Sequence, residues 1–583
     1  MKKGLLSCIC AITCLMAMAQ WNANPSESML AWPDGKSYYA NEMQIGEDGT
    51  TWLCVYHPQN GTVATTIQAI DSTGVKLLGE EGLLVSEERN MTYTVVNQLI
   101  MVDKDGNAIV VVHDLRNSPS EEQRLSYTIY KVSPEGEMLW GDEGIAVDGA
   151  IAYEMSAAMK MIQLEDGSYV FAWMRLNGNL FAIEMQRVSN DGELLWNADD
   201  VRLMDNTSTY TYPYLVNAGD NQFILVYAKG SNQDLYARKI DFDGTPVWPE
   251  DTRIYRGGFG SIPLWTILDV QPSGDGGVIV SWNDDRYYTN IESAYLSYVK
   301  PNGELGFTAG EEAQKLGYAG WRSFNVTARY DSKTNSFIAL WRETDANQNW
   351  YRMVTQRVSL QGELLWGEEG LELCPMDTQP IGYMNLQPGG EGEMGVFYMM
   401  NHSYGFGDVT CYAMLLDTET GESVWEEQPF TFTENVSEKA SLEVTPMAQG
   451  DYWVAKWEDN GVLGSDNNVD RLYMQRINRN MTLGNPEPGA VKATRTEMSQ
   501  FRAISTIVND EAIFQVVNTK EQPVSISIYD MQGKLVTTAY NGVMPQGSNY
   551  VTWNASSCNL SKGIYLATLA SQEGTATVKI IIN

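Results

Sequence analysis

Polar side chains that could bind a ligand or transfer a proton recur at one place along this 583-residue chain. Most follow an apolar run that ends in an aromatic residue, as Trp173 precedes Arg175 and Trp282 precedes Asp284. Such a run predicts a strand, so these polar residues are expected where a strand gives way to a loop, a common location of binding residues. The candidate binding residues are His113, Asp114, Arg116, Arg175, Asp284, Asp285, Arg286, Arg342, His402, Glu458 and Asp459.

Two kinds of chemistry are open to residues of these types. Paired carboxylates can act as acid and base in a glycoside hydrolase or lyase when they lie about 5–10 Å apart, and the candidates are Asp284, Asp285, Glu458 and Asp459. Histidine can transfer protons near neutral pH or bind a metal, and all three histidines share this position, namely His57, His113 and His402. An enzyme of this kind is the alternative function that the sequence leaves open.

Binding without catalysis is the function that the sequence favours. The chain has no Gly-x-Ser-x-Gly elbow, no His-Glu-x-x-His pair and no phosphate-binding loop. No metal-ligand spacing is present either, so we predict no catalytic residue, no metal and no cofactor. The aromatic and polar positions would form a recognition surface for a glycan or a protein. The competing interpretation is that the aromatics pack the core and the charges form a solvated rim.

The elements that must position these residues belong to a repeated unit. The segment Gln186–Trp196 recurs as Gln356–Trp366, and weaker copies lie at 131–140 and 239–248. One branched residue per copy recurs at intervals of 52 to 62 residues, at Ile70, Val132, Val188, Ile240, Val299, Val358, Leu416 and Ile477. A period of this length is typical of arrays built from one small structural unit.

Each unit predicts four strands. In the unit around Trp196, apolar runs near 161–164, 169–173, 181–188 and 201–203 are separated by segments with Asp-Gly or Asn-Gly, which favour hairpins. Four-stranded units arranged around an axis form a β-propeller, which leaves few strand edges exposed. We therefore expect an all-β protein with an eight-bladed β-propeller, or a seven-bladed one if a weak unit is not a blade.

Two features indicate how the ring closes and packs. The eighth unit lacks its Gly-x-x-x-Trp element, and Met29–Gly35 near the N-terminus matches that element, so we expect this segment to complete the last blade. A tryptophan holds the same position in five units and is expected to pack between blades, at Trp140, Trp196, Trp248, Trp366 and Trp425.

The charge balance excludes several classes of partner. Lys and Arg number 39 and Asp and Glu number 74, so the net charge is 39 − 74 = −35. Such a chain lacks the clustered cations that nucleic acid requires, and an anionic membrane would repel it. We expect a monomer without a nucleic-acid partner, with the acids forming a solubilising coat.

The N-terminus predicts a secretory signal peptide at residues 1–20. Lys2 and Lys3 precede an apolar run from Leu5 to Ala19, and small residues precede the expected cleavage point. The mature chain keeps Cys54, Cys374, Cys411 and Cys558. An oxidising compartment permits disulfides, and their pairing is left open; small buried thiols in strands are the interpretation that we prefer.

The C-terminal segment alternates strands with glycine turns, which predicts a small β-sandwich. Its motif residues are Tyr529, Asp530, Gly533, Lys534, Trp553, Gly563, Tyr565 and Lys579. In these residues the segment resembles the type A C-terminal sorting domain of the type IX secretion system (Por) of Bacteroidetes, for which we expect an immunoglobulin-like sandwich. The resemblance implies recognition by the secretion machinery, passage through the periplasm and outer membrane, and then attachment to the outer cell surface or release.

The chain is therefore expected to divide into a signal peptide at 1–20, a propeller domain at 21–483, a Pro/Gly-rich linker at 484–500 and a sorting domain at 501–583. The expected function is that of a secreted or cell-surface propeller that binds a glycan or a surface protein.

Overall fold

The computed structural model describes most of the chain. The described residues are 21–32, 40–88, 98–119, 122, 124–149, 156–197, 201–256, 268–285, 291–317, 320–402, 407–426, 428–461, 471–485, 501–503, 507–508, 511–518, 520–530, 534–555, 560–571 and 574–582. The predicted signal peptide lies outside them, as do Arg286, Gly533 and Cys558. Contacts divide the chain into two compact units, Met1–Asn485 and Pro486–Asn583, and each is described by itself.

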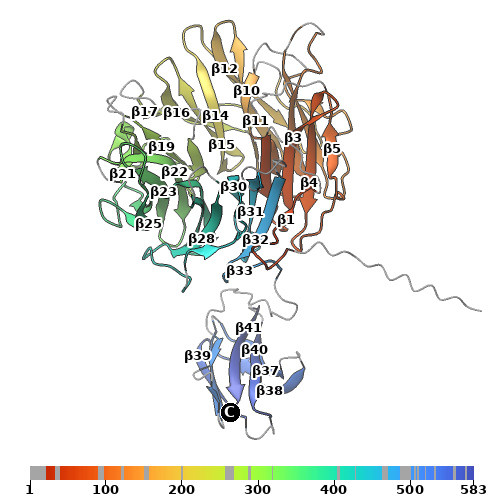
Figure 1. Cartoon of the computed structure of the whole chain (residues 1–583), viewed down its shortest axis with the longest axis vertical. Coiled ribbons are helices and arrows are strands. Elements are labelled where there is room, and N and C mark those ends of the chain that lie inside the picture. Colours follow the sequence, from red (N-terminus) through yellow and green to blue (C-terminus); the bar gives the residue numbers. More distant parts are fainter. Residues whose placement is uncertain are drawn as a thin grey trace, which may run out of the picture. The chain divides into compact units, whose positions relative to one another are not determined.

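The first unit contains eight antiparallel sheets, which we call blades 1 to 8 in chain order (Figure 1). Blades 1 to 4 contain β2 (Ala40–Ile45), β3 (Thr51–Gln59), β4 (Thr62–Ile70) and β5 (Leu83–Ser86); β6 (Ile100–Val102), β7 (Ala108–Asp114), β8 (Ser126–Val132) and β9 (Ile145–Ala146); β10 (Ser156–Gln163), β11 (Tyr169–Asn177), β12 (Leu180–Val188) and β13 (Arg202–Leu203); and β14 (Tyr210–Gly219), β15 (Gln222–Lys229), β16 (Asp234–Asp241) and β17 (Thr252–Tyr255).

Blades 5 to 7 contain β18 (Asp269–Pro272), β19 (Val278–Asp284), β20 (Ser293–Val299) and β21 (Gln314–Leu316); β22 (Arg322–Asp331), β23 (Ser336–Thr344), β24 (Tyr351–Ser359) and β25 (Leu371–Asp377); and β26 (Ile381–Gly390), β27 (Glu393–Asn401), β28 (Val409–Asp417) and β29 (Phe430–Thr431). Blade 8 contains β30 (Lys439–Val444), β31 (Tyr452–Asp459), β32 (Arg471–Asn478), β33 (Thr482–Leu483) and the N-terminal β1 (Met29–Leu30). No helix among these described parts of the chain is long and apolar enough to cross a membrane.

The blades form a closed ring because a hydrophobic core lies between each pair of neighbours. Blades 1 and 2 share one core cluster, and the same holds around the ring to blades 7 and 8. A further cluster joins blade 8 to blade 1 through Trp32, Leu53 and Val454. Each sheet thereby covers both of its faces with its neighbours, which a single blade could not do alone. The eight-bladed propeller predicted from the repeat is confirmed.

The N-terminal strand completes the last blade, as its match to the repeat predicted. Met29 lies opposite Met474 in the β1–β32 pair, and Ala31 N–H donates to the Leu472 carbonyl at 2.9 Å. Trp21 and Trp32 flank this strand and are buried. Residues from the two ends of the repeat region thus share one sheet and close the ring.

Each repeated tryptophan donates a hydrogen bond to the next blade. The indole N–H of Trp248 donates to the Pro301 carbonyl at 2.9 Å, in the turn between the third and fourth strands of blade 5. Gly303 in that turn has φ +87°, and a Cβ there would lie 2.9 Å from the Trp248 ring, so glycine serves both turn and packing. The same donor reaches the same turn from Trp140, Trp196, Trp366 and Trp425.

The Gln-Arg pair of the repeat holds the hairpin that carries this tryptophan. Gln186 Nε2 donates to the Trp196 carbonyl at 3.1 Å, and its Oε1 accepts the Trp196 N–H at 3.1 Å. Arg187 Nη1 crosses to blade 4 and donates to the Phe242 carbonyl at 3.1 Å. These bonds explain why the Gln-Arg-Val-Ser and Trp parts of the repeat recur together.

The second unit is a two-sheet β-sandwich. One sheet contains β34 (Phe501–Ala503), β36 (Glu511–Asn518) and β39 (Gly547–Asn554); the other contains β35 (Ile507–Val508), β37 (Gln522–Asp530), β38 (Leu535–Met544), β40 (Gly563–Ser571) and β41 (Gly574–Ile582). Trp553 and Tyr565 belong to its core, and Asp530 Oδ1, at the end of β37, accepts the Lys534 N–H at 2.9 Å. Tyr529 and Asp530 are the last two residues of β37, Gly563 opens β40, and the exposed Lys579 lies within β41. The sandwich predicted for this segment is confirmed.

Candidate functional site

The first strand of every blade lies nearest the axis of the ring, because these strands contact one another from blade to blade. In five of them the pairing register shifts at a residue of positive φ, namely Ala158, Tyr212, Asn325, Tyr383 and Ser441. A bulge at this place leaves an extra residue in the strand and increases its twist. The strands concerned are β10, β14, β22, β26 and β30, and we call the first strands of all eight blades the innermost strands.

Polar side chains of the innermost strands bind the backbone of the neighbouring blade. Glu42 accepts N–H bonds from Leu99 at 2.5 Å and Ile100 at 3.2 Å, and Glu443 accepts one from Met43 at 3.2 Å. Asp269 and Asn385 do the same for Ala328 and Val444. The inner edge of a blade has no strand beside it, so these side chains satisfy backbone groups that the edge would leave unpaired.

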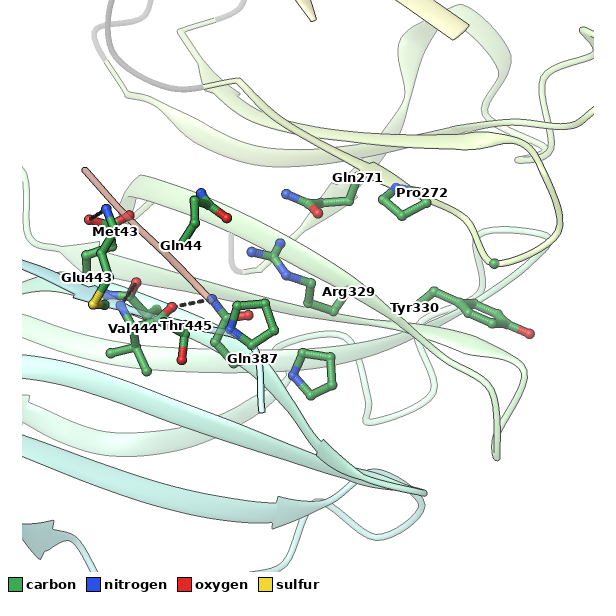
Figure 2. Close-up of a pocket in the computed structure, with 14 residues that line it drawn as sticks. Met43, Gln44, Gln271, Pro272, Arg329, Tyr330, Gln387, Glu443, Val444 and Thr445 are labelled. Atoms are coloured by element: carbon green, nitrogen blue, oxygen red, sulfur yellow. Dashed lines mark hydrogen bonds between the residues drawn. The ribbon is translucent and has the colours of Figure 1, made fainter. Parts of the chain in front are cut away.

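A pocket of about 580 Å³ lies among the innermost strands (Figure 2). Its walls come from the second half of the innermost strands of blades 1, 5, 6, 7 and 8 and from the turns that follow. Figure 2 shows the head groups of Gln44, Gln271 and Arg329 extending toward the same space, with Gln387 on the opposite wall. A concave site of this size with a few placed polar groups is the usual form of a small-ligand site.

The pocket wall breaks the symmetry of the repeat. One position of the innermost strand can be compared between blades. It is the residue that pairs with a fixed point of the second strand, three residues before the end of that strand's apolar run. In blades 1 to 4 this residue is apolar: Met43, Met101, Ile162 and Val216. In blades 5 to 8 it is polar: Gln271, Arg329, Gln387 and Thr445. All four polar residues line the pocket.

The charged groups at the pocket are paired with each other inside the protein. Arg329 Nη1 lies 2.8 Å from Asp269 Oδ2, and Glu443 Oε2 lies 2.6 Å from Lys456 Nζ. Burial alone would raise the pKa of Asp269, but the charge of Arg329 and hydrogen bonds from Thr327, Gln271 and Ala328 hold it below its usual value. The pocket therefore has polar walls without a net charge.

Glu42 is a titratable group that lies next to the pocket wall. Gln44 Nε2 donates to Glu42 Oε1 at 3.4 Å. Burial, together with the charge of Glu443, raises the pKa of Glu42 to about 7. Burial also lowers the pKa of Lys160, which faces Glu42 from blade 3 and lies 5.3 Å from the Tyr214 ring centroid.

The candidate residues predicted from the sequence lie at the other end of the blades. They end or follow the second strands, whereas the pocket lies toward the turns between the first and second strands. None of them lines this pocket. Arg286 lies outside the described residues, as do 89–97, 403–406 and 462–470. The predicted loop site therefore stays a prediction.

Several of these candidates make contacts within their own blade. His113 is buried and stacks on Tyr127 with centroids 4.1 Å apart, and burial lowers its pKa to about 3. Asp114 accepts a bond from Arg116 Nε at 2.7 Å, which pairs two of the candidates. Arg175 lies 3.1 Å from Glu184.

The remaining described candidates are also held by their surroundings. Their partners are Trp282 Nε1 for Asp284 at 2.9 Å, the Ile381 carbonyl for Arg342 at 2.6 Å, the Tyr412 hydroxyl for His402 at 3.0 Å, Asn41 Nδ2 for Glu458 at 2.6 Å, and the Ser437 hydroxyl for Asp459 at 2.8 Å. Asp285, the last described residue before Arg286, follows β19. Among the described residues, no group of three His, Cys, Asp or Glu side chains could hold a metal ion.

The described cysteines are free and buried. Cys54, Cys374 and Cys411 lie on the blades 1, 6 and 7, and burial raises the pKa of each thiol. Thiols of this kind react slowly because little thiolate is present.

Comparison with known proteins identifies the C-terminal unit. Residues 510–583 match a family described as the secretion system C-terminal sorting domain. A search of curated proteins finds no match to the chain. Among solved structures, the Dos1 propeller is 12% identical with a TM-score of 0.38, covering 77% of this chain and 95% of that one.

Two further solved structures show the range of the similarity. The polysaccharide lyase Uly1 is 10% identical with a TM-score of 0.37, covering 78% of this chain and 92% of that one. The endo-arabinase of Bacteroides thetaiotaomicron VPI-5482 is 11% identical with a TM-score of 0.27, covering 45% of this chain and 92% of that one. The sequence motif, the sandwich and the family match agree on the C-terminal unit, while blade topology gives the fold of the rest. The chain is thus a β-propeller protein that carries a type IX secretion system C-terminal sorting domain and is exported to the cell surface or secreted.

Proposed function

We propose that the exported propeller binds an extracellular glycan or protein in the pocket among its innermost strands and performs no catalysis. One observation carries this proposal: four consecutive blades have polar residues at a register position that the other four fill with apolar residues. Packing in a repeat protein favours the same residue type in every unit, because each unit contacts equivalent neighbours. A departure confined to the wall of one pocket is best explained by a ligand.

The pocket also retains hydrogen-bonding groups for a ligand. Gln271 and Gln387 each donate one amide bond, to Asp269 at 2.7 Å and to the Val444 carbonyl at 2.7 Å. Among the described residues, their amide oxygens have no partner, and the bonds of Arg329 all leave from Nη1. A ligand can use the remaining donors and acceptors without breaking a bond within the protein.

A hydrolase or lyase remains the alternative. Such an enzyme needs two carboxylates on either side of the bond that is cleaved. The carboxylate on the pocket wall, Glu443, pairs with Lys456 and with the Met43 N–H. The pocket as described therefore supports recognition better than acid–base chemistry.

The proposal is tested with the full mature protein on a printed glycan array and against a panel of purified extracellular proteins. We expect a bound ligand whose affinity falls at least about tenfold in the Gln271→Ala/Gln387→Ala variant, since two buried polar contacts are lost. Met101→Ala is the matched control, because Met101 occupies the same register position on the apolar side of the ring. Absence of any ligand, or equal loss in the control, would contradict the proposal.

A further inference from the structure

We propose that the ligand of this pocket is a neutral saccharide, an uncharged molecule rich in hydroxyl groups. This inference rests on the proposed function, because it names the ligand class of the same pocket. It depends on three features of the wall: paired charges, amide groups and flat apolar surfaces.

The paired charges disfavour an ionic ligand. Arg329 is neutralised by Asp269, and Glu443 by Lys456, so neither wall charge is available as a counter-ion. The side chains of Arg329 and Asp269 are 18% and 14% exposed, which places this pair in a recessed, poorly solvated position. A charged ligand would lose hydration there without gaining an opposite charge. The net charge of −35 adds a long-range repulsion of anions.

The amide groups favour hydroxyl groups as partners. An amide offers both a donor and an acceptor, and a hydroxyl can accept from one and donate to the other. Gln44, Gln271 and Gln387 each use an amide N–H within the protein, to Glu42, Asp269 and Val444, and among the described residues their Oε1 atoms have no partner. Arg329 adds donors from Nε and Nη2 beside them. Such groups exchange hydrogen bonds with water for hydrogen bonds with sugar hydroxyls at little net cost.

Flat apolar surfaces lie between the polar groups. Pro272 and Pro388 follow Gln271 and Gln387 in the chain, and both line the pocket. Tyr330 lies at one margin of the pocket in Figure 2. A Cβ at Gly274 would lie 2.1 Å from the Tyr330 ring, so this glycine makes room for the ring. Polar groups alternating with flat rings can contact both the hydroxyls and the C–H faces of a sugar.

The volume of the pocket limits the length of the saccharide that it encloses. About 580 Å³ lies in the lower half of the range of small-molecule sites. The pocket therefore accommodates a short oligosaccharide, or the end or a branch of a longer chain, rather than a long stretch of polymer.

The inference is tested by calorimetric titration of the full mature protein with matched trisaccharides. Maltotriose, laminaritriose and mannotriose serve as neutral probes, trigalacturonate as the anionic probe and the chitosan trimer as the cationic probe. We expect at least one neutral trisaccharide to bind at least about tenfold more tightly than either charged probe. Gln271→Ala should weaken that binding, and Met101→Ala should not.

A change of charge gives a sharper readout. Asp269→Asn keeps an acceptor for Thr327 and Ala328 but leaves Arg329 without its counter-ion. We expect the ratio of the affinity for trigalacturonate to the affinity for the neutral ligand to rise by about tenfold or more. Asp251→Asn is the control, because it removes the same charge from the Arg238 pair in blade 4, away from the pocket.

The outcomes separate the inference from the proposed function. Tight binding of trigalacturonate or of the chitosan trimer by the unchanged protein, lost in Gln271→Ala, would overturn the neutral-saccharide inference and leave a ligand-binding pocket. If only a protein, and no saccharide, binds at this pocket, the neutral-saccharide inference is likewise overturned and a ligand-binding pocket remains. If no ligand of any class responds to the pocket variants, both proposals are wrong.

Discussion

Glu42 is an innermost-strand residue whose charge state affects stability. Its carboxylate bonds to Leu99 and Ile100 of the next blade, yet burial and the charge of Glu443 raise its pKa to about 7. The folded protein therefore holds this proton more tightly than the unfolded chain, where the pKa has its usual value of 4.5. Stability from this group is present below pH 4.5 and is lost as the pH rises to about 7.

We predict that Glu42→Gln removes this loss, because the amide keeps an acceptor and carries no charge. Each unit by which folding shifts the pKa corresponds to about 1.4 kcal/mol of unfolding free energy. The gain in unfolding free energy at pH 8 is therefore at most roughly 3 kcal/mol, and it becomes smaller as the pH falls toward 4.5. Denaturant unfolding at pH 4.5, 6 and 8 measures it. Glu47→Gln, an exposed change in the same blade, should show no such dependence. A constant offset for Glu42→Gln at all pH values would refute the assigned cause.

The polar residues of the pocket could not be predicted from the sequence, for a physical reason. Gln271 and Gln387 look like ordinary strand-end residues, and only their register across the blades shows that they share a wall with Arg329. The bulges hide that register, because they insert a residue at positions such as Ala158 and Tyr212 that carry no glycine signal. The one available clue was the Gln-Pro pair that recurs before the turns of blades 5 and 7.

The burial of His113 was equally hidden. A histidine after an apolar run predicts a loop position, but His113 is the sixth residue of β7 and stacks on Tyr127. The strand extends beyond the apolar run because its partner β8 continues to Ser126 opposite Asp114. Pairing between strands, rather than local polarity, decides where this strand ends.

At the scale of elements, the hairpin carrying each repeated tryptophan joins neighbouring blades. The hairpin and the position of its tryptophan could be predicted because their sequence signals are local: Asp-Gly turns, alternating strands and a tryptophan at a fixed spacing. The hydrogen bond from each indole to the next blade could not be predicted, since it depends on how blades stack. Trp248 illustrates both points. Its position follows from the local repeat, whereas the contact of its ring with Gly303 and the bond from its N–H to the Pro301 carbonyl depend on how the blades stack.

We predict that Trp248→Phe lowers the unfolding free energy by about 1 kcal/mol, since it removes the donor to the Pro301 carbonyl and keeps an aromatic ring. Trp248→Ala should cost about 3–5 kcal/mol because it also leaves a cavity. Denaturant unfolding followed by circular dichroism measures both. Trp350→Phe is the matched control, because Trp350 is 47% exposed. Equal effects of Trp248→Phe and Trp350→Phe would count against the proposed contact between blades.

The N-terminal strand is a second element with a testable role. Deleting residues 21–32 removes β1 and the buried Trp21 and Trp32, and it exposes the edge of β32 at Leu472 and Met474. We predict faster hydrogen exchange in β32 and aggregation through the exposed edge, because unpaired edges recruit other strands. Hydrogen exchange with mass spectrometry and size-exclusion chromatography report these changes. An unaltered exchange rate in β32 would mean that β1 does not close the ring.

At the scale of the whole molecule, the chain is strongly acidic, whereas the charged side chains of the pocket wall are paired. The net charge of −35 is spread over turns in different blades, including the exposed Glu143, Glu368 and Glu369. A high net charge of one sign generally favours the solubility of a large repeat protein. The sandwich has its own hydrophobic core, so the sorting domain and the propeller are separate packed structures.

This separation yields a prediction about export. Deleting residues 501–583 removes the whole sandwich, including the segment 510–583 that matches the sorting family, and leaves all eight propeller blades intact. We expect the shortened protein to fold, keep its ligand and accumulate in the periplasm, because the machinery no longer has a domain to recognise. Cell fractionation and protease accessibility on intact cells measure its location. A periplasmic reporter fused to residues 484–583 should conversely reach the surface. Surface exposure of the shortened chain, or retention of the fusion, would show that the propeller itself takes part in sorting.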